Sequence, residues 1–184
     1  MSIPNLITLA RILSVPVMVW AIVTGWMLAA FLLFLAAGVS DAIDGYLAKR
    51  FGMTSELGAY LDPLADKALI VTIYVTLGIS GNIPLWLVLL VVSRDVMIVA
   101  AVLLAWVMDK PLPMKPLLVS KLNTVAQIVF AGLVLGSLGL GFAADRLIAV
   151  VMGVVTLLSL ASIAAYVREW VRHMGADGAA VGPP

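Results

Sequence analysis

Four aspartates lie close together in a chain that is otherwise mostly apolar. Asp41 and Asp44 are spaced i, i+3, and Asp62 and Asp66 are spaced i, i+4. On helices each pair projects from one face, one turn apart, so two short acidic stripes can face one another. Carboxylates grouped at the edge of a bilayer repel one another and are costly to desolvate. We therefore expect two hard divalent cations with oxygen ligands to balance the four charges.

The composition places the chain in a membrane. Its 184 residues are 64% hydrophobic and 11% charged, whereas about 25% of the residues in a soluble domain are charged. We predict an all-α integral membrane protein with six transmembrane helices, an N-terminal interfacial helical segment and a polar, metal-containing cavity at the cytoplasmic side. Residues 1–174 are expected to form one domain and residues 175–184 a disordered tail. Nothing indicates a nucleic-acid partner.

Apolar stretches predict the spans, and short turns separate them. Turns are expected at residues 24–26, 80–84 and 139–141, each of which contains glycine. The helices are expected at about residues 2–23, 27–49, 58–79, 85–107, 121–138 and 145–170.

Positive charges fall mainly on one side of this arrangement. Six of them belong to the side that holds both termini, while Arg146 lies on the other. By the positive-inside rule both termini are cytoplasmic, and the expected location is the bacterial inner (plasma) membrane. The six are Lys49, Arg50, Lys110, Lys115, Arg168 and Arg172.

The first helix carries a narrow polar stripe. Asn5, Thr8 and Arg11 recur at every third position among apolar neighbours. One interpretation is an interfacial helix with a snorkelling arginine. The other is that the stripe forms one wall of a polar site.

The residues around the aspartates suit displacement at phosphorus. Paired metal ions clamp phosphate oxygens and stabilise charge on the attacking and departing oxygens. Gly45 and Ala48 extend the acidic face with small side chains, which lets a pyrophosphate approach closely. Lys49 or Arg50 would meet a phosphate at the water boundary. Pro63 is expected to kink its helix or open it locally, because proline removes a helical hydrogen bond.

Direct transfer to an acceptor is the simpler chemistry for this chain. A carboxylate in the cleft can take the proton from an attacking hydroxyl. Cysteine is absent and the single histidine, His173, lies near the C-terminus. Thiolate nucleophiles and chemistry that needs a histidine pair are therefore excluded.

The pattern Asp41-x2-Asp44-Gly45-x2-Ala48-Lys49-x8-Gly58-x3-Asp62-x3-Asp66 resembles the signature of the CDP-alcohol phosphatidyltransferase family. Lys49 is the one departure, because the family commonly has arginine there. The resemblance implies six transmembrane helices, a homodimer and two divalent cations, Mg²⁺ or Mn²⁺. It implies four metal ligands, with the last also the general base, namely Asp41, Asp44, Asp62 and Asp66. The nucleotide-binding surface would comprise Asn5, Thr8, Gly45, Ala48, Lys49 and Gly58.

Other segments resemble the branch of the family that forms cardiolipin and CMP. They are IPNLITLAR at residues 3–11, YLDPLADK at 60–67, SRDVM at 93–97 and KPLLVSKLNT at 115–124. This resemblance implies attack by phosphatidylglycerol on CDP-diacylglycerol in a lipid bilayer. The alternative acceptor is glycerol 3-phosphate, as in phosphatidylglycerolphosphate synthases. The cations expected at the acceptor phosphate are Arg50, Arg94, Lys115 and Lys121.

Two further alternatives concern the buried charges and the glycines. Acidic residues within a membrane can also serve a cation transporter or channel. Arg94 and Asp95 point about 100° apart on a helix, so we expect each to satisfy a neighbouring span rather than to pair. Gly132 and Gly136 have the i, i+4 spacing of close helix packing.

Overall fold

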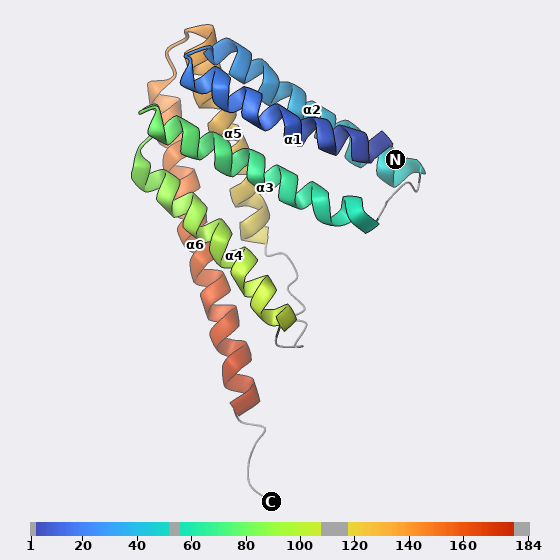
Figure 1. The fold of residues 1–184 in the computed structure, drawn as a ribbon. Coiled ribbons are helices and arrows are strands. Elements are labelled where there is room, and N and C mark those ends of the chain that lie inside the picture. The colour runs from blue at the N-terminus through green and yellow to red at the C-terminus, as the bar shows by residue number, and fades with distance from the viewer. Residues whose placement is uncertain (1–2, 52–55, 108–117, 179–184) are drawn as a thin grey trace, which may run out of the picture.

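The computed structural model describes residues 3–51, 56–107 and 118–178, and within them the side chains of 10–41, 43, 67–100 and 118–168. Six helices and no strand make up this part of the chain, which confirms the all-α prediction (Figure 1). In order they are α1 (Ile3–Val23), α2 (Met27–Phe51), α3 (Glu56–Ile79), α4 (Leu85–Val107), α5 (Leu118–Leu140) and α6 (Asp145–Gly178).

Two helices differ from expectation. α6 continues to Gly178, beyond residue 174, where we expected the helical domain to end. A glycine inside a helix costs only about 1 kcal/mol relative to alanine, so Gly175 need not stop it. α3 is one continuous helix across Pro63, so the expected opening does not interrupt it. Residues 179–184 lie outside the described part of the chain.

Glycine ends two of the helices in the way the sequence predicts. Gly25 and Gly81 adopt φ values of 80° and 73°, in the left-handed region that glycine enters without a steric penalty. After α1, the Gly25 amide donates to the Ile22 carbonyl and the Trp26 amide donates to the Ala21 carbonyl. These paired bonds satisfy carbonyls that the helix end would otherwise leave open.

The helices pack as a layered bundle. α1 contacts both α2 and α3, α2 contacts α5, α5 contacts α6, and α4 contacts α3 and α6 (Figure 1). The core draws side chains from every helix, and within it the Tyr74 and Phe130 rings lie 5.8 Å apart. α1 and α5 each contact both α2 and α3, the two helices that carry the aspartates.

Three glycines of α5 let it approach α2 closely. A Cβ added to Gly139 would lie 2.9 Å from the backbone nitrogen of Leu28. At Gly136 a Cβ would lie 3.1 Å from the Phe31 ring, and Gly132 faces another phenylalanine of α2 at the same distance. The prediction that Gly132 and Gly136 serve close packing is confirmed.

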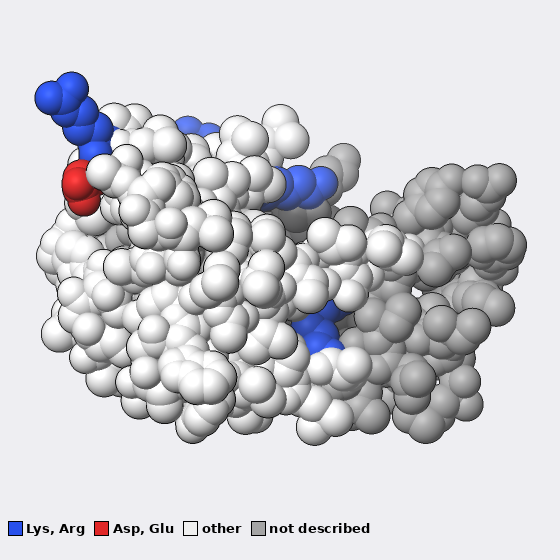
Figure 2. All heavy atoms as spheres, turned by 90° about the horizontal axis from the view of Figure 1, so that it is seen from above, with Lys and Arg blue, Asp and Glu red and all other residues white. Residues whose placement is uncertain are grey.

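The outer surface is largely apolar. Large apolar side chains are exposed on all six helices, and the described surface in Figure 2 is mostly uncharged. Within the described residues, Leu118–Leu140 and Asp145–Arg168 are long and apolar enough to cross a membrane. These two helices fit the membrane prediction, while six crossings stay a prediction.

Candidate active site

Arg11 of α1 and Asp41 of α2 form an ion pair. The Arg11 Nη2 atom lies 2.8 Å from the Asp41 Oδ1 atom, with 2% of the arginine side chain exposed and 46% of the aspartate side chain exposed. The arginine therefore does not snorkel. Its place between two helices supports the interpretation that the polar stripe of α1 forms a wall of the site.

A cavity of about 390 Å³ begins at this ion pair. Arg11, Asp41 and Thr124 are its polar and charged lining residues, and the rest of the wall is apolar. Side chains from α2, α3 and α5 form that wall, namely Phe34, Leu35, Ala37, Val39, Leu69, Ile70 and Ile128, together with Gly38. An apolar cavity with a few polar groups at one end is the usual form of a site for a small amphiphilic molecule.

The cavity arises from the way α2 and α5 separate. The two backbones touch where Gly139 meets Leu28, and further along the helices phenylalanine rings fill the space beside Gly136 and Gly132. Beyond these rings, Gly38 of α2 faces open space, with no described atom within 4 Å of an added Cβ. The gap therefore widens toward the end of α2 that carries Asp41.

A second cavity lies on the other side of Arg11. It measures about 320 Å³ and is walled by α1 and α2, mainly through small side chains such as Ala10, Ser14, Ala36 and Ser40. Arg11 and Ala37 border both cavities. Among the described residues, Arg11 is therefore the one charged residue that lines both cavities.

Of the four predicted metal ligands, only Asp41 has a described side chain. Asp44 lies on α2, and Asp62 and Asp66 lie on α3, so both acidic stretches flank the link between Phe51 and Glu56. Among the described side chains no group of three acids or histidines is close enough to hold a metal ion. The side chains of the other signature residues lie outside this set, namely Asn5, Thr8, Asp44, Gly45, Ala48, Lys49, Arg50, Gly58, Asp62 and Asp66, as does all of Lys115.

The donor chemistry of this region fits a hard divalent cation. Asp41 presents a half-exposed carboxylate to the polar end of the larger cavity. The other three predicted ligands are also carboxylates, the donor type that Mg²⁺ and Mn²⁺ favour. Their arrangement around an ion stays a prediction.

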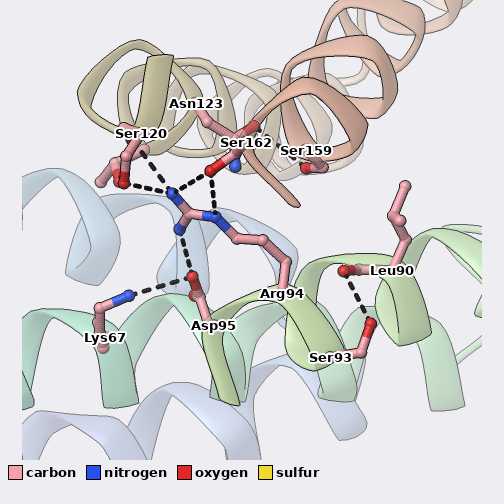
Figure 3. A network of polar contacts seen from close by, with 10 residues as sticks. Lys67, Leu90, Ser93, Arg94, Asp95, Ser120, Asn123, Ser159 and Ser162 are labelled. Atoms are coloured by element: carbon pink, nitrogen blue, oxygen red, sulfur yellow. Dashed lines mark hydrogen bonds and ion pairs between the residues drawn. The ribbon is translucent and has the colours of Figure 1, made fainter. Parts of the chain in front are cut away.

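A second polar cluster joins four helices (Figure 3). Asp95 Oδ1 lies 3.0 Å from Lys67 Nζ of α3 and 2.5 Å from Nη1 of its neighbour Arg94. The expectation that Arg94 and Asp95 would not pair is wrong. Their Cα–Cβ directions differ, but the arginine side chain is long enough to fold back. Arg94 also donates to Ser120 of α5 and Ser162 of α6, so the expected bonds to neighbouring helices are present.

Two of the cations predicted to bind the acceptor phosphate, Arg94 and Lys121, have described side chains, and the two differ in exposure. Arg94 is 1% exposed and enclosed by this cluster, whereas Lys121 is exposed in the first turn of α5. Sequence reasoning did not assign a role to Lys67, Ser120 or Ser162. The sequence does contain a signal, because both helices carry polar residues within apolar stretches. They are Ser120, Asn123 and Gln127 on α5 and Ser159 and Ser162 on α6.

Comparisons with known proteins define the class. The sequence profile of the CDP-alcohol phosphatidyltransferases matches residues 1–161, and the chain belongs to that family. A Schizosaccharomyces pombe protein named "Cardiolipin synthase (CMP-forming) / mitochondrial hydrolase fusion protein" is 33% identical over 95% of this chain and 32% of its own length.

Two other relatives, one human and one from rice, have names that differ from each other. The human "Cardiolipin synthase (CMP-forming)" is 35% identical over 70% of this chain and 48% of its own length. A rice "CDP-diacylglycerol--glycerol-3-phosphate 3-phosphatidyltransferase 1, chloroplastic" is 36% identical over 70% of this chain and 44% of its own length. The chain thus spans about a third to a half of the length of these relatives.

Proposed function

We propose that this protein transfers the phosphatidyl group of CDP-diacylglycerol to phosphatidylglycerol, giving cardiolipin and CMP. Family membership and the names of the cardiolipin-forming relatives support this assignment. The structural observation that carries it is Asp41, the first aspartate of the signature, at the charged end of an apolar cavity. That cavity suits the lipid part of a substrate whose phosphates lie at the aspartates.

The proposed chemistry uses the acceptor hydroxyl as the nucleophile. Its oxygen forms a bond to the phosphatidyl phosphorus, and the bond from that phosphorus to CMP breaks with its electron pair leaving on CMP. Asp66 takes the hydroxyl proton. The nucleotide is held by Asn5, Thr8, Gly45, Ala48, Lys49 and Gly58, and the acceptor phosphate meets cations among Arg50, Lys115 and Lys121.

Two divalent cations, Mg²⁺ or Mn²⁺, complete the proposed site. Asp41, Asp44, Asp62 and Asp66 hold them, and when bound they stabilise negative charge on phosphate oxygens. Arg11 keeps the Asp41 carboxylate at the cavity end through its 2.8 Å contact. The residues of the chain therefore place the carboxylates, and Arg11 offsets the charge of Asp41.

The proposal includes the membrane setting. The six helices cross a bacterial inner membrane with both termini in the cytoplasm, and two copies form a homodimer. The exposed apolar side chains and the two span-length helices α5 and α6 support the membrane part. The described lining of the larger cavity argues against the cation channel or transporter, since apart from Arg11, Asp41 and Thr124 it is apolar and offers no polar path for an ion.

A second acceptor has a specific observation in its favour. The rice relative is named for transfer to glycerol 3-phosphate, and its identity to this chain matches that of the cardiolipin-forming relatives. Both acceptors are anionic, so a basic pocket alone does not separate them.

The deciding experiment supplies purified protein with CDP-diacylglycerol, Mg²⁺ and either phosphatidylglycerol or glycerol 3-phosphate. CMP release and the lipid product are measured. Cardiolipin formed from phosphatidylglycerol supports the proposal, and phosphatidylglycerol phosphate formed only from glycerol 3-phosphate supports the alternative. If neither acceptor gives CMP, the transferase proposal fails, and if Asp66→Asn is as active as the parent, the proposed role of Asp66 fails.

A further inference from the structure

The cluster of Lys67, Arg94 and Asp95 is unbalanced in charge. One carboxylate oxygen of Asp95 serves both cations, at 3.0 Å from Lys67 Nζ and 2.5 Å from Arg94 Nη1. Among the described side chains, no second acid forms an ion pair with either cation. The three groups therefore carry a net charge of +1, with Arg94 and Asp95 buried and Lys67 partly exposed at the edge of the bundle.

Arg94 is not the group that offers this charge to a ligand. Its side chain is 1% exposed, and Nε, Nη1 and Nη2 each donate a hydrogen bond within the protein (Figure 3). The acceptors are Asp95, Ser120 and Ser162, on α4, α5 and α6. A ligand would have to displace these bonds, so Arg94 acts as a clamp that fixes Asp95.

Lys67 has the opposite properties. Its side chain is 37% exposed, and its one hydrogen bond within the described residues goes to Asp95. An ammonium group has three N–H donors, which leaves two for a ligand. The bond to Asp95 also holds a flexible side chain in one place, which reduces the entropy that binding must remove.

The position of Lys67 places this charge beside the site but away from the ion pair of Arg11. Lys67 directly follows Asp66 on α3 and is directed to α4. α4 contacts α3 and α6, whereas the Arg11–Asp41 pair lies between α1 and α2. Lys67 thus lies on the side of α3 that meets α4, whereas the ion pair lies where α1 meets α2, which leaves room for two substrates at separate charged groups.

We propose that Lys67 binds the anionic phosphate of the acceptor, with Asp95 and Arg94 as positioning residues. This inference rests on the proposed function and adds a residue to its acceptor site. The ligand chemistry is a phosphate oxygen, which either a phosphodiester lipid or a phosphate monoester supplies.

The test is a kinetic comparison in detergent micelles with CMP release as the signal. Lys67→Met removes the charge at similar length, Lys67→Arg keeps it, and Arg146→Met removes a charge from the exposed first turn of α6. The Michaelis constants for phosphatidylglycerol, glycerol 3-phosphate and CDP-diacylglycerol are measured for each variant. Thermal unfolding is recorded in parallel.

We expect Lys67→Met to raise the KM for the accepted acceptor about tenfold or more and to leave the KM for CDP-diacylglycerol within about twofold, as loss of one charge-assisted contact predicts. Lys67→Arg should restore most of the acceptor affinity, and Arg146→Met should match the parent. Asp95→Asn should also raise the acceptor KM, but not further in a Lys67→Met background.

Three results overturn the inference. They are an unchanged acceptor KM in Lys67→Met, a rise in the CDP-diacylglycerol KM instead, or a fall in kcat alone. If Lys67→Met does not fold, Lys67→Gln takes its place under the same criteria. A parent protein that releases no CMP with either acceptor refutes the proposed function, which is a separate outcome from an active parent with an indifferent Lys67.

Discussion

Arg11 and Asp41 form a 2.8 Å ion pair in which the cation is enclosed and the anion is half-exposed. The guanidinium is held by packing between α1 and α2, while the carboxylate faces the larger cavity. The pair therefore fixes the first aspartate of the signature from behind and leaves its front accessible. This arrangement has consequences for stability as well as for activity.

Asp41→Asn should destabilise the fold. The substitution removes a carboxylate charge 2.8 Å from a buried guanidinium, and losing such a charged contact costs about 1–3 kcal/mol. Thermal unfolding in detergent measures the change. The matched control is Asp145→Asn in the first turn of α6, where the side chain is exposed and the expected loss is below about 1 kcal/mol. Equal losses in the two variants would contradict a structural role for the ion pair.

Removal of divalent cations should abolish CMP release. EDTA takes away the ions that the four carboxylates are proposed to hold, and added Mg²⁺ or Mn²⁺ should restore the activity. Asp41→Asn should need a higher Mg²⁺ concentration for half-maximal rate, because a neutral amide is a weaker ligand than a carboxylate. Full activity in EDTA would refute the metal-dependent mechanism.

Filling the larger cavity should weaken binding of the lipid donor. Gly38→Leu adds a side chain at a cavity-lining position where an added Cβ meets no described atom within 4 Å, so the branch extends into the open cavity. We expect the KM for CDP-diacylglycerol to rise at least about fivefold, about 1 kcal/mol of binding, while the unfolding temperature changes little. Gly153→Leu on α6 is the control, since its surroundings are equally open and it borders neither cavity. An unchanged KM would mean that the donor lipid does not use this space.

Gly139→Ala should destabilise the contact between α2 and α5. The added Cβ would lie 2.8 Å from the Leu28 Cα and 2.9 Å from its nitrogen, and backbone atoms cannot turn aside as a side chain can. The expected loss is about 1–3 kcal/mol. Gly153→Ala meets no described atom within 4 Å and should stabilise α6 by about 0.5–1 kcal/mol. If the unfolding temperatures of both variants shift in the same direction relative to the parent, the close approach of α2 and α5 is contradicted.

The sequence predicted the parts of the fold that depend on local chemistry. Apolar runs and turn glycines place the helices, because each depends only on residues nearby, and Gly25 and Gly81 end their helices as expected. The polar stripe of α1 left two interpretations open, and the burial of Arg11 beside Asp41 favours a wall of the site, although the partner of Arg11 was not named in advance.

Long-range contacts set the limit of prediction. Arg94 finds Ser162 on α6, 68 residues later in the chain, and no local pattern specifies that partner. The angular argument that separated Arg94 from Asp95 considered backbone directions and ignored the reach of a guanidinium. The sequence shows Lys67 only as a charge next to the aspartates, and it is the fold that brings it to Asp95.

The glycine contact at Leu28 also determines how the larger cavity can change size. Because the backbones of α2 and α5 are pinned together at Gly139, any tilt between these helices has its fulcrum there. The displacement then grows with distance along the helices and is larger beside Asp41 than beside Gly132. A tilt of a few degrees would therefore change the width of the cavity mainly at its charged end, where the substrate phosphates are proposed to lie.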